Sequence, residues 1–444
     1  MKNYLIIQNK IKDFKKKFIE VEGDKSLSIR FVLLSALTKG KCSAINLLKS
    51  EDVLNAINCI NKLGIKTIFR KRKTEIFGKG LFGLKFKKNL TLNTGNSGTT
   101  ARLLCSLLID SNHHIKITGD ESLKKRDMKR IINPLKKFGA FFKSKKGKLP
   151  LMIKGTKFPK PIRFTEDLGS AQCKSAVMIA ALKTKGVTKL KCLPSRNHTE
   201  LMFKNILKIP IKIVKTKKYE MININGQKEL KPFNYKIPGD ISSASFFIVL
   251  TLLSKDKILK IKNVNLNSSR TGVVKILKMM GGKIKILNLR NYKGEKIGDI
   301  MIRSTNKLKS INLNSRYNSS AIDEFLLIFL VACKCKGISI FNNLGELNKK
   351  ESKRLDWGIK ILSMMGVKVK RIKNSGLKIW GQENFNLNKK ITIKNYLKDH
   401  RILMLCVIAG LTLGGNWKIF DQNCYKTSFP SFKKTLKKLG AKIK

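Results

Sequence analysis

A short pattern recurs along the chain: a helical segment ends in a glycine, and a segment of alternating β-branched residues follows. Its five copies read KLGIKTIF, KFGAFFK, MMGGKIKI, MMGVKVK and KLGAKIK, with the glycines at Gly64, Gly139, Gly281, Gly366 and Gly440. Glycine tolerates the left-handed conformation that often ends a helix, and alternation is typical of a strand. A sixth copy without the glycine, ILKIPIKIV, lies near Ile206. The copies are roughly 70 to 85 residues apart, which suits one α/β unit each and is too long for a solenoid.

Three copies precede the segment IPGD at Ile237, and three follow it. At 444 residues, the chain is also longer than one hydrophobic core usually supports. We therefore predict an α/β protein with two pseudo-symmetric domains of three α/β units each. A cleft between two such domains would be the natural place for a ligand.

The strong positive charge suggests a nucleic-acid partner, but its distribution does not favour one. The formal net charge is +66, the apolar fraction is 42% and the aromatic fraction is only 7%. The cations are mostly lysine, they are spread along the whole length, and no basic stretch alternates with rings that could stack on bases. We expect no nucleic-acid partner. A basic RNA- or DNA-binding protein, with steeply salt-dependent binding, is the alternative from another class.

The cysteines indicate a reducing compartment. They are nine in number and scattered, so they form no obvious disulfide framework, and no cluster has metal-ligand spacing. The segment MKNYLIIQNKIKDF lacks the apolar core of a signal peptide, and apolar runs such as residues 325–333 are too short to span a bilayer. We expect a cytoplasmic protein with no membrane association and no metal.

Several segments in the first half place cations and hydroxyls at an expected helix start. Lys25, Ser26 and Arg30 stand ahead of the apolar run 31–37 in DKSLSIR, Gly98 lies in TGNSGTTARLL, and Arg126 lies in the basic loop LKKRDM. A helix N-terminus favours an anion, and lysine and arginine add charge-assisted hydrogen bonds. For each segment alone, an ordinary cap or turn with solvated basic neighbours is the alternative.

Other polar residues open apolar segments. Ser170 and Gln172 could cap a helix or bind substrate hydroxyls, and PSRNHTELM adds Ser195, Arg196 and His198. In the second half, Asp323 and Glu324 stand before an apolar run, as an N-cap or a general base.

Two further helix starts in the second half carry charges. Lys350 and Arg354, four residues apart around Glu351, are expected on one helical face, and Asp399, His400 and Arg401 head another apolar helix. Anion-binding helix starts in both halves, accompanied by carboxylates, suit an enzyme that handles two phosphorylated or carboxylated substrates.

These segments resemble, in order and nearly end to end, the 5-enolpyruvylshikimate-3-phosphate synthase family. The matching motifs are DKSLSIR, GNSGTTARLL, TGDESLKKRDM, SAQCKSA, SRNHTE, PGDISSASFF, RTGVVKILKMMG, IDEF, KKESKRL, DHR and TSFP. The resemblance implies a two-domain fold with three α/β units around a pseudo-threefold in each domain. It places a discontinuous domain at residues 1–23 and 239–444 and an inserted domain at residues 24–238. It also implies a cytoplasmic monomer that needs no cofactor.

The implied reaction moves the enolpyruvyl group of phosphoenolpyruvate to the 5-hydroxyl of shikimate 3-phosphate and releases phosphate. The family's shikimate 3-phosphate contacts fall on Lys25, Ser26, Arg30, Ser170, Ala171, Gln172, Ser195, Arg196, Asp323 and Lys350. Its phosphoenolpyruvate contacts fall on Lys25, Gly98, Arg126, Gln172, Arg354 and Arg401. Asp323 matches the proton acceptor for the attacking hydroxyl. Glu351 matches the group that moves a proton at the methylene carbon, assisted by Lys25 and His400.

Four positions depart from the family pattern. Lys353 replaces a common aspartate, Asn197 replaces the aspartate of SRDHTE, and the other two lie in the loop after Arg126 and near the end of the sequence. Asp127 stands where a proline usually follows Arg126, and Thr427 occupies the place of a lysine that contacts phosphoenolpyruvate in some members, which leaves Lys426 one residue out of register. The nearest rival is the sister enolpyruvyl transferase that acts on UDP-N-acetylglucosamine. That enzyme has asparagine in place of Ser26 and typically a reactive cysteine in the loop LKKRDM, so both positions argue against it.

Overall fold

The computed structural model describes residues 3–12, 14, 16–373 and 375–444. The chain divides into two compact units. Unit 1 comprises Met1–Glu22, Pro238–Asn291 and Lys296–Lys444, and unit 2 comprises Gly23–Ile237 and Tyr292–Glu295. Each unit has an apolar core of its own and three small sheets, so the expected α/β class with three units in each half is confirmed.

The three sheets of unit 2 share one strand pattern, a parallel pair extended by two antiparallel strands. The first sheet has the order β14 (Asn234–Lys236), β3 (Lys39–Ile45), β5 (Lys73–Lys79) and β4 (Lys66–Phe69). The second has the order β6 (Leu90–Asn93), β7 (Ile115–Thr118), β9 (Leu151–Lys154) and β8 (Phe141–Ser144). The third has the order β10 (Arg163–Glu166), β11 (Val187–Cys192), β13 (Glu220–Asn225) and β12 (Ile211–Lys215).

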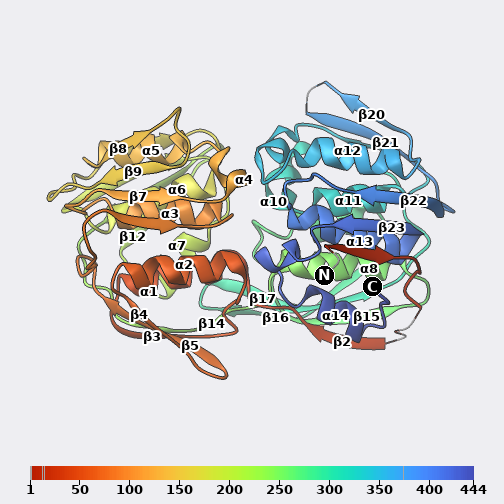
Figure 1. The fold of residues 1–444 in the computed structure, drawn as a ribbon, viewed down its shortest axis with the longest axis horizontal. Helices are drawn as coiled ribbons and strands as arrows, with labels where there is room; N and C mark the ends of the chain where they lie inside the picture. The colour runs from red at the N-terminus through yellow and green to blue at the C-terminus, as the bar shows by residue number, and fades with distance from the viewer. Residues whose placement is uncertain (1–2, 13, 15, 374) are drawn as a thin grey trace. The chain divides into compact units, whose positions relative to one another are not determined.

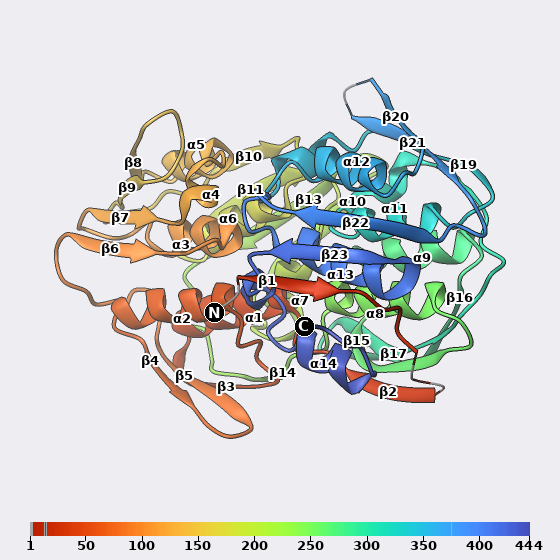
Figure 2. The ribbon, with the colours of Figure 1, turned by 45° about the vertical axis from the view of Figure 1, so that its right-hand side comes forward.

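Unit 1 repeats this pattern. Its first sheet has the order β16 (Lys283–Tyr292), β17 (Glu295–Arg303), β15 (Ile258–Asn265) and β2 (Lys16–Glu20). Its second has the order β18 (Asn312–Leu313), β19 (Gly337–Phe341), β21 (Gly376–Gly381) and β20 (Val369–Ile372). Its third has the order β1 (Tyr4–Ile7), β23 (Gly414–Phe420) and β22 (Leu387–Ile393), and Figure 2 shows β1, in dark red, beside the blue β23.

The segment after Gly440 completes the third sheet of unit 1 without forming a regular strand. Ile6 and Lys444 exchange both backbone hydrogen bonds, at 2.8 and 3.2 Å. This reciprocal exchange is the arrangement of an antiparallel pair, so the last residues lie beside β1 where the other sheets have a fourth strand.

One helix from each sheet motif lies in the core of its unit. In unit 2 these core helices are α1 (Lys25–Ala36), α3 (Gly98–Leu107) and α6 (Ala171–Ala181); in unit 1 they are α8 (Ile241–Leu253), α11 (Phe325–Ala332) and α13 (His400–Leu413). Helix α3 contacts α1 and α6, while α8, α11 and α13 all contact one another (Figure 1). Helix α11 is buried on every side, because residues such as Leu327 and Phe329 leave it no polar face. Five of these six core helices begin in a polar or charged segment singled out from the sequence, and α8 begins in the motif PGDISSASFF, which contributed only to the family resemblance.

The remaining helices cover the sheets or connect the elements. In unit 2 they are α2 (Glu51–Lys62), α4 (Glu121–Lys124), α5 (Lys129–Lys137) and α7 (His198–Asn205). In unit 1 they are α9 (Gly272–Met279), α10 (Asn318–Ala321), α12 (Arg354–Met364) and α14 (Phe432–Lys438), with 3₁₀ turns η1 (Ser315–Tyr317), η2 (Gly345–Lys349) and η3 (Cys424–Thr427). Across the described ranges, no helix has both the length and the apolar character that crossing a bilayer requires.

The five predicted glycine joints are confirmed as left-handed helix ends. Their φ angles lie between 84° and 103°, at Gly64, Gly139, Gly281, Gly366 and Gly440. The sixth copy adopts the same kind of turn without glycine, because Lys208 has a φ of 53°. The joint is therefore a property of the repeated unit, and glycine is its least strained residue.

Two glycines of unit 2 have similar φ angles but different space for a side chain, so a comparison of the two separates backbone strain from steric conflict. Gly64 and Gly80 have φ angles of 84° and 85°, but a Cβ at position 64 would lie 2.6 Å from the Lys85 carbonyl oxygen, whereas one at position 80 would meet nothing within 4 Å. We expect Gly80→Ala to lower the free energy of unfolding by about 1 kcal/mol through strain alone. Gly64→Ala should lower it by roughly 1–3 kcal/mol more. Urea unfolding of both variants measures the difference, and equal losses would contradict it.

Candidate active site

The first group of predicted site residues surrounds the start of α1 in unit 2. The Asp24 carboxylate caps the helix by accepting from the Leu27 amide at 2.9 Å, so Lys25 and Ser26 lie in its first turn, as the motif predicted. Lys25 Nζ lies 2.8 Å from Asp52 Oδ2, contributed by α2. The carboxylate holds the ammonium group at the helix start, where an anionic ligand would also be favoured.

Arg30 is a buried cation held by neutral acceptors. It is 3% exposed, and its guanidinium donates to Thr199 Oγ1 at 2.8 Å, to Ser175 Oγ at 2.9 Å and to the Ser26 carbonyl at 3.1 Å. Burial lowers the pKa of Arg30 to about 10, against the attraction of Glu200, so it remains charged at neutral pH. Within the described part of the chain, no carboxylate lies at ion-pair distance from it. A cation in this state favours an anionic or strongly polar ligand.

The starts of α3 and α6 are joined by Gln172. Its amide nitrogen donates to Thr99 Oγ1 at 2.8 Å, and its amide oxygen accepts from Arg102 Nη1. Arg102 Nη2 donates to the Asp127 carbonyl at 3.0 Å, which ties this pair to the loop before α5. Arg102 and Thr99 lie inside a motif that the sequence flagged, but nothing in the pattern distinguished them from their neighbours.

Gly98 and Arg126 lie against each other. A Cβ at position 98 would be 2.6 Å from Arg126 Nη1, so only glycine leaves the guanidinium its place over the start of α3. Asp127 does not disturb this loop: its carboxylate accepts from the Lys129 amide at 2.9 Å, at the start of α5. Asp127, which stands where the family usually has a proline, thus supplies a hydrogen-bond acceptor at the start of α5.

The other predicted residues of unit 2 lie on neighbouring segments. Ser170 caps α6 by accepting from the Cys173 amide at 3.3 Å, and Ala171 is the first helical residue. Ser195 and Arg196 are half-buried just before α7, and within the described residues the buried Oγ of Ser195 has no hydrogen-bond partner. His198 is not exposed to solvent, and its Nδ1 lies 2.7 Å from Glu295 Oε1, which fits a structural role for this histidine.

The second group of predicted site residues lies in unit 1 around Arg354. The guanidinium, which is 1% exposed, binds Asp399 through Nε at 2.8 Å and Nη2 at 3.2 Å, and it also contacts Glu351. Burial alone would lower the pKa of Arg354, but the attraction of Asp399 and then of Glu351 outweighs it, so the pKa is raised. Burial likewise opposes ionisation of Asp399, yet Arg354 holds the pKa of this carboxyl below its usual range. The pair is charged at neutral pH.

Asp323 belongs to the same group. Its Oδ1 lies 3.3 Å from Lys350 Nζ and 3.4 Å from Arg354 Nη1. Glu324 occupies the N-cap position of α11, but its side chain makes no capping hydrogen bond there. A carboxylate placed between two cations is positioned to accept a proton from a bound hydroxyl group.

The expected helical face of Lys350 and Arg354 is wrong. Lys350 has an extended backbone, and α12 begins only at Arg354. Asn348 causes this late start, because its side-chain oxygen accepts from the Leu355 amide at 2.9 Å and from the Asp356 amide at 3.3 Å. Lys350 and Arg354 nevertheless meet at Asp323.

The helix start predicted at residues 399–401 is confirmed. Asp399 caps α13 by accepting from the Arg401 amide at 3.0 Å, and His400 is buried in the first turn. Arg401 Nη1 donates to the Asp323 carbonyl at 2.8 Å, so the two residues lie side by side. Farther along the chain, Lys426 is exposed and Thr427 is buried in η3.

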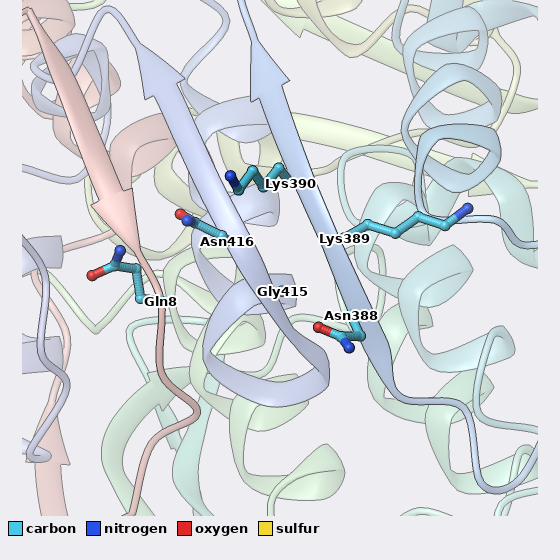
Figure 3. A pocket seen from close by; sticks show the side chains of 6 residues that line it. All are labelled: Gln8, Asn388, Lys389, Lys390, Gly415 and Asn416. Carbon is cyan, nitrogen blue, oxygen red and sulfur yellow. The ribbon is translucent and has the colours of Figure 1, made fainter.

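Two surface hollows contain none of these residues. One lies over β1, β22 and β23 and is lined by Gln8, Asn388, Lys389, Lys390, Gly415 and Asn416 (Figure 3). The other is lined by Lys433, Lys434, Lys437 and Lys438 of α14. Neither lining includes a carboxylate, so neither offers an acid–base pair. Among the described residues, no group of three or more histidine, cysteine or acidic side chains is placed to hold a metal.

Comparison with known proteins gives a family match over nearly the whole chain. Residues 9–436 match the family model described as EPSP synthase (3-phosphoshikimate 1-carboxyvinyltransferase). The chain is 37% identical over 432 residues to the 3-phosphoshikimate 1-carboxyvinyltransferase of Thermoanaerobacter sp. (strain X514), and the match covers 97% of this chain and 99% of the relative. It is 39% identical over 427 residues to the enzyme of that name from Thermodesulfovibrio yellowstonii, and this match covers 94% of this chain and 95% of the relative.

Solved structures show the same fold. An EPSP synthase from Acinetobacter baumannii superposes with a TM-score of 0.86 at 32% identity, covering 99% of both chains. The enolpyruvyl transferase NikO from Streptomyces tendae superposes with a TM-score of 0.78 at 12% identity, covering 99% of this chain and 98% of the other, which shows the fold alone. The two-domain enolpyruvyl-transferase fold is thus confirmed, and the chain belongs to the EPSP synthase (3-phosphoshikimate 1-carboxyvinyltransferase) family.

Proposed function

We propose that the two groups of side chains divide the work of the family's reaction. As a member of this family, the chain transfers the carboxyvinyl group of phosphoenolpyruvate to the 5-hydroxyl of shikimate 3-phosphate and releases phosphate. This reaction is a step of the shikimate pathway towards chorismate and the aromatic amino acids. The main support for this division of roles is the cluster around Arg354, where Asp323, Glu351 and Asp399 all contact one guanidinium.

Shikimate 3-phosphate is bound mainly by unit 2. Arg30 is a buried cation without an acid partner in the described residues, and the buried Ser195 Oγ also lacks a partner there; both fit a ligand with carboxylate, phosphate and hydroxyl oxygens. The proposed contacts are Lys25, Ser26, Arg30, Ser170, Ala171, Gln172, Ser195 and Arg196, together with Asp323 and Lys350 of unit 1.

Phosphoenolpyruvate is bound by arginines from both groups. Arg126 and Gly98 supply a guanidinium over a helix N-terminus, Arg354 and Arg401 supply two more guanidiniums, and Lys25 and Gln172 complete the set. Arginine suits this task because its fork matches phosphate and carboxylate and does not change protonation during the reaction.

Asp323 and Glu351 carry the proton transfers. The C2 carbon of phosphoenolpyruvate becomes electrophilic only as its methylene group gains a proton, so an acid must act there while a base takes the proton of the attacking hydroxyl. Asp323, held by Lys350 and Arg354, is the base. Glu351 pairs with Arg354, and transfer of that guanidinium to the substrate anion would release Glu351 to take up a proton and deliver it.

The reaction then closes without a net change in the protein. The hydroxyl oxygen bonds to C2 and gives a tetrahedral intermediate that keeps its phosphate and carboxylate. Glu351 takes a proton back from the new methyl group as the C–O bond to phosphate breaks, and Lys25 and His400 assist. The departing phosphate takes up the hydroxyl proton that Asp323 had accepted, so both carboxylates return to their starting states. The arginines stabilise the anionic groups throughout.

Phosphate release tests the function directly. The purified chain is incubated with phosphoenolpyruvate and either shikimate 3-phosphate or UDP-N-acetylglucosamine, and released phosphate is measured. We expect release only with shikimate 3-phosphate. Release only with the sugar nucleotide would overturn the proposed acceptor.

Removal of either proton-transfer carboxylate should affect turnover more than binding. We expect Asp323→Ala and Glu351→Ala each to lower kcat by roughly 10²–10⁴-fold, with much smaller changes in the KM of either substrate. Glu346→Ala is the matched control, because this exposed carboxylate of η2 pairs only with Lys349 in the described residues. Near-normal kcat in both site variants would remove these carboxylates from the chemistry.

Gly98→Ala should weaken phosphoenolpyruvate binding by displacing Arg126. The new Cβ would lie 2.6 Å from Arg126 Nη1, so we expect the KM for phosphoenolpyruvate to rise about tenfold or more, with little change for shikimate 3-phosphate. A double-mutant cycle with Arg126→Ala checks the cause. If Gly98→Ala has its full effect in the Arg126→Ala background, the proposed displacement is wrong.

We further propose that the protein has two domains, at residues 1–23 with 239–444 and at residues 24–238, and that it works as a cytoplasmic monomer. Separate apolar cores support the two domains. All nine cysteines are free and buried, which supports a reducing compartment. Sedimentation equilibrium tests the monomer.

A further inference from the structure

Glu324 is a buried carboxylate without a role in the reaction proposed above. It follows Asp323 and is 1% exposed. Its Oε1 accepts from Ser242 Oγ at 2.5 Å and lies 3.4 Å from Arg401 Nη1. Ser242 and Arg401 lie in the first turns of α8 and α13, and Glu324 directly precedes α11. One carboxylate therefore joins the starts of all three core helices of unit 1.

A second layer of contacts fixes how Ser242 faces Glu324. The buried Arg270 donates from Nη2 to Ser242 Oγ at 2.7 Å, and the same nitrogen lies 3.4 Å from Asp240 Oδ1. A serine hydroxyl has a single hydrogen, so a hydroxyl that accepts from Arg270 gives its own hydrogen to Glu324. Ser242 thus holds the same carboxylate oxygen, Oε1, that Arg401 Nη1 contacts.

Arg401 is anchored through a single guanidinium nitrogen, Nη1. Its Nη1 contacts Glu324 and donates to the Asp323 carbonyl, while Nε and Nη2 have no hydrogen-bond partner in the described part of the chain. The side chain is 11% exposed. An arginine anchored through one nitrogen keeps its other N–H groups for an anion. Its side chain is already in the binding rotamer when that anion arrives.

We infer that Glu324 is a positioning residue that sets Arg401 for the anionic substrate and fixes its distance from the base, Asp323. The inference rests on the proposed role of Arg401 in binding phosphoenolpyruvate. Glu324 supplies the negative charge beside Arg401, whereas Asp240 is the acid beside the second buried guanidinium, Arg270. Without that charge, Arg401 lacks its anchoring acid and turns away from its binding orientation.

The experiment compares substrate-specific kinetics of Glu324→Gln with those of the parent chain. Glutamine keeps the shape and a hydrogen-bond acceptor but removes the charge. We expect the KM for phosphoenolpyruvate to rise about tenfold, which is the loss typical of one charge-assisted contact. The dissociation constant of shikimate 3-phosphate alone, measured by calorimetry, should stay within about twofold of the parent value. Ser242→Ala should shift the KM in the same direction by a smaller factor, because it removes the group that orients the carboxylate.

Two controls separate this inference from a general loss of stability and from the site assignment. Glu383→Gln makes the same chemical change at an exposed position of unit 1 and should leave all constants unchanged. Arg401→Ala tests the assigned binding role itself. If Arg401→Ala leaves the phosphoenolpyruvate KM unchanged, the site assignment fails. If Arg401→Ala raises the phosphoenolpyruvate KM but Glu324→Gln and Ser242→Ala leave it unchanged, the inference about Glu324 is overturned while the assignment stands. The same conclusion follows if these two variants weaken the binding of both substrates equally. If Glu324→Gln does not fold, Ser242→Ala decides alone.

Discussion

The fold depends on burying helices that have no polar side. Helices such as α11, with the sequence FLLIFLVA, can be stable only when other apolar surfaces surround them, so each unit packs three of them together and covers them with sheets. Buried polar side chains in such a core need hydrogen-bond partners, and the backbone N–H groups at the helix starts also require acceptors. The charged motifs therefore gather at the starts of these core helices, and the site residues follow from a packing constraint.

Burial also explains why the two groups of side chains differ in character. Around Arg354, three carboxylates compensate a cation that has lost its water, and the result is a charged cluster ready to exchange partners. Around Arg30, the described residues supply only hydroxyl and carbonyl acceptors. The first arrangement suits proton transfer, because carboxylates lie beside movable cations, and the second suits capture of an anion.

The sequence predicted the repeated unit and most of the helix starts, because glycine ends and N-terminal motifs are local signals. Gly64 and its four counterparts mark joints that depend on a single backbone angle. Lys350 shows the limit: the spacing to Arg354 suggested one helix, but the Asn348 side chain caps α12 from outside and delays its start. Asp52 and Glu324 show another limit, since their partners lie on other elements and no spacing along the chain reveals such pairs.

The pairing of β1 with β23 has a consequence for how the molecule forms on the ribosome. Tyr4 pairs with Phe420, a partner translated roughly 400 residues later, whereas unit 2 is almost entirely one continuous stretch. Unit 2 can therefore complete its core while most of unit 1 is still unsynthesised. The first strand must meanwhile wait unpaired, and the lysines that surround its apolar residues help to keep a nascent chain of this kind from associating with others.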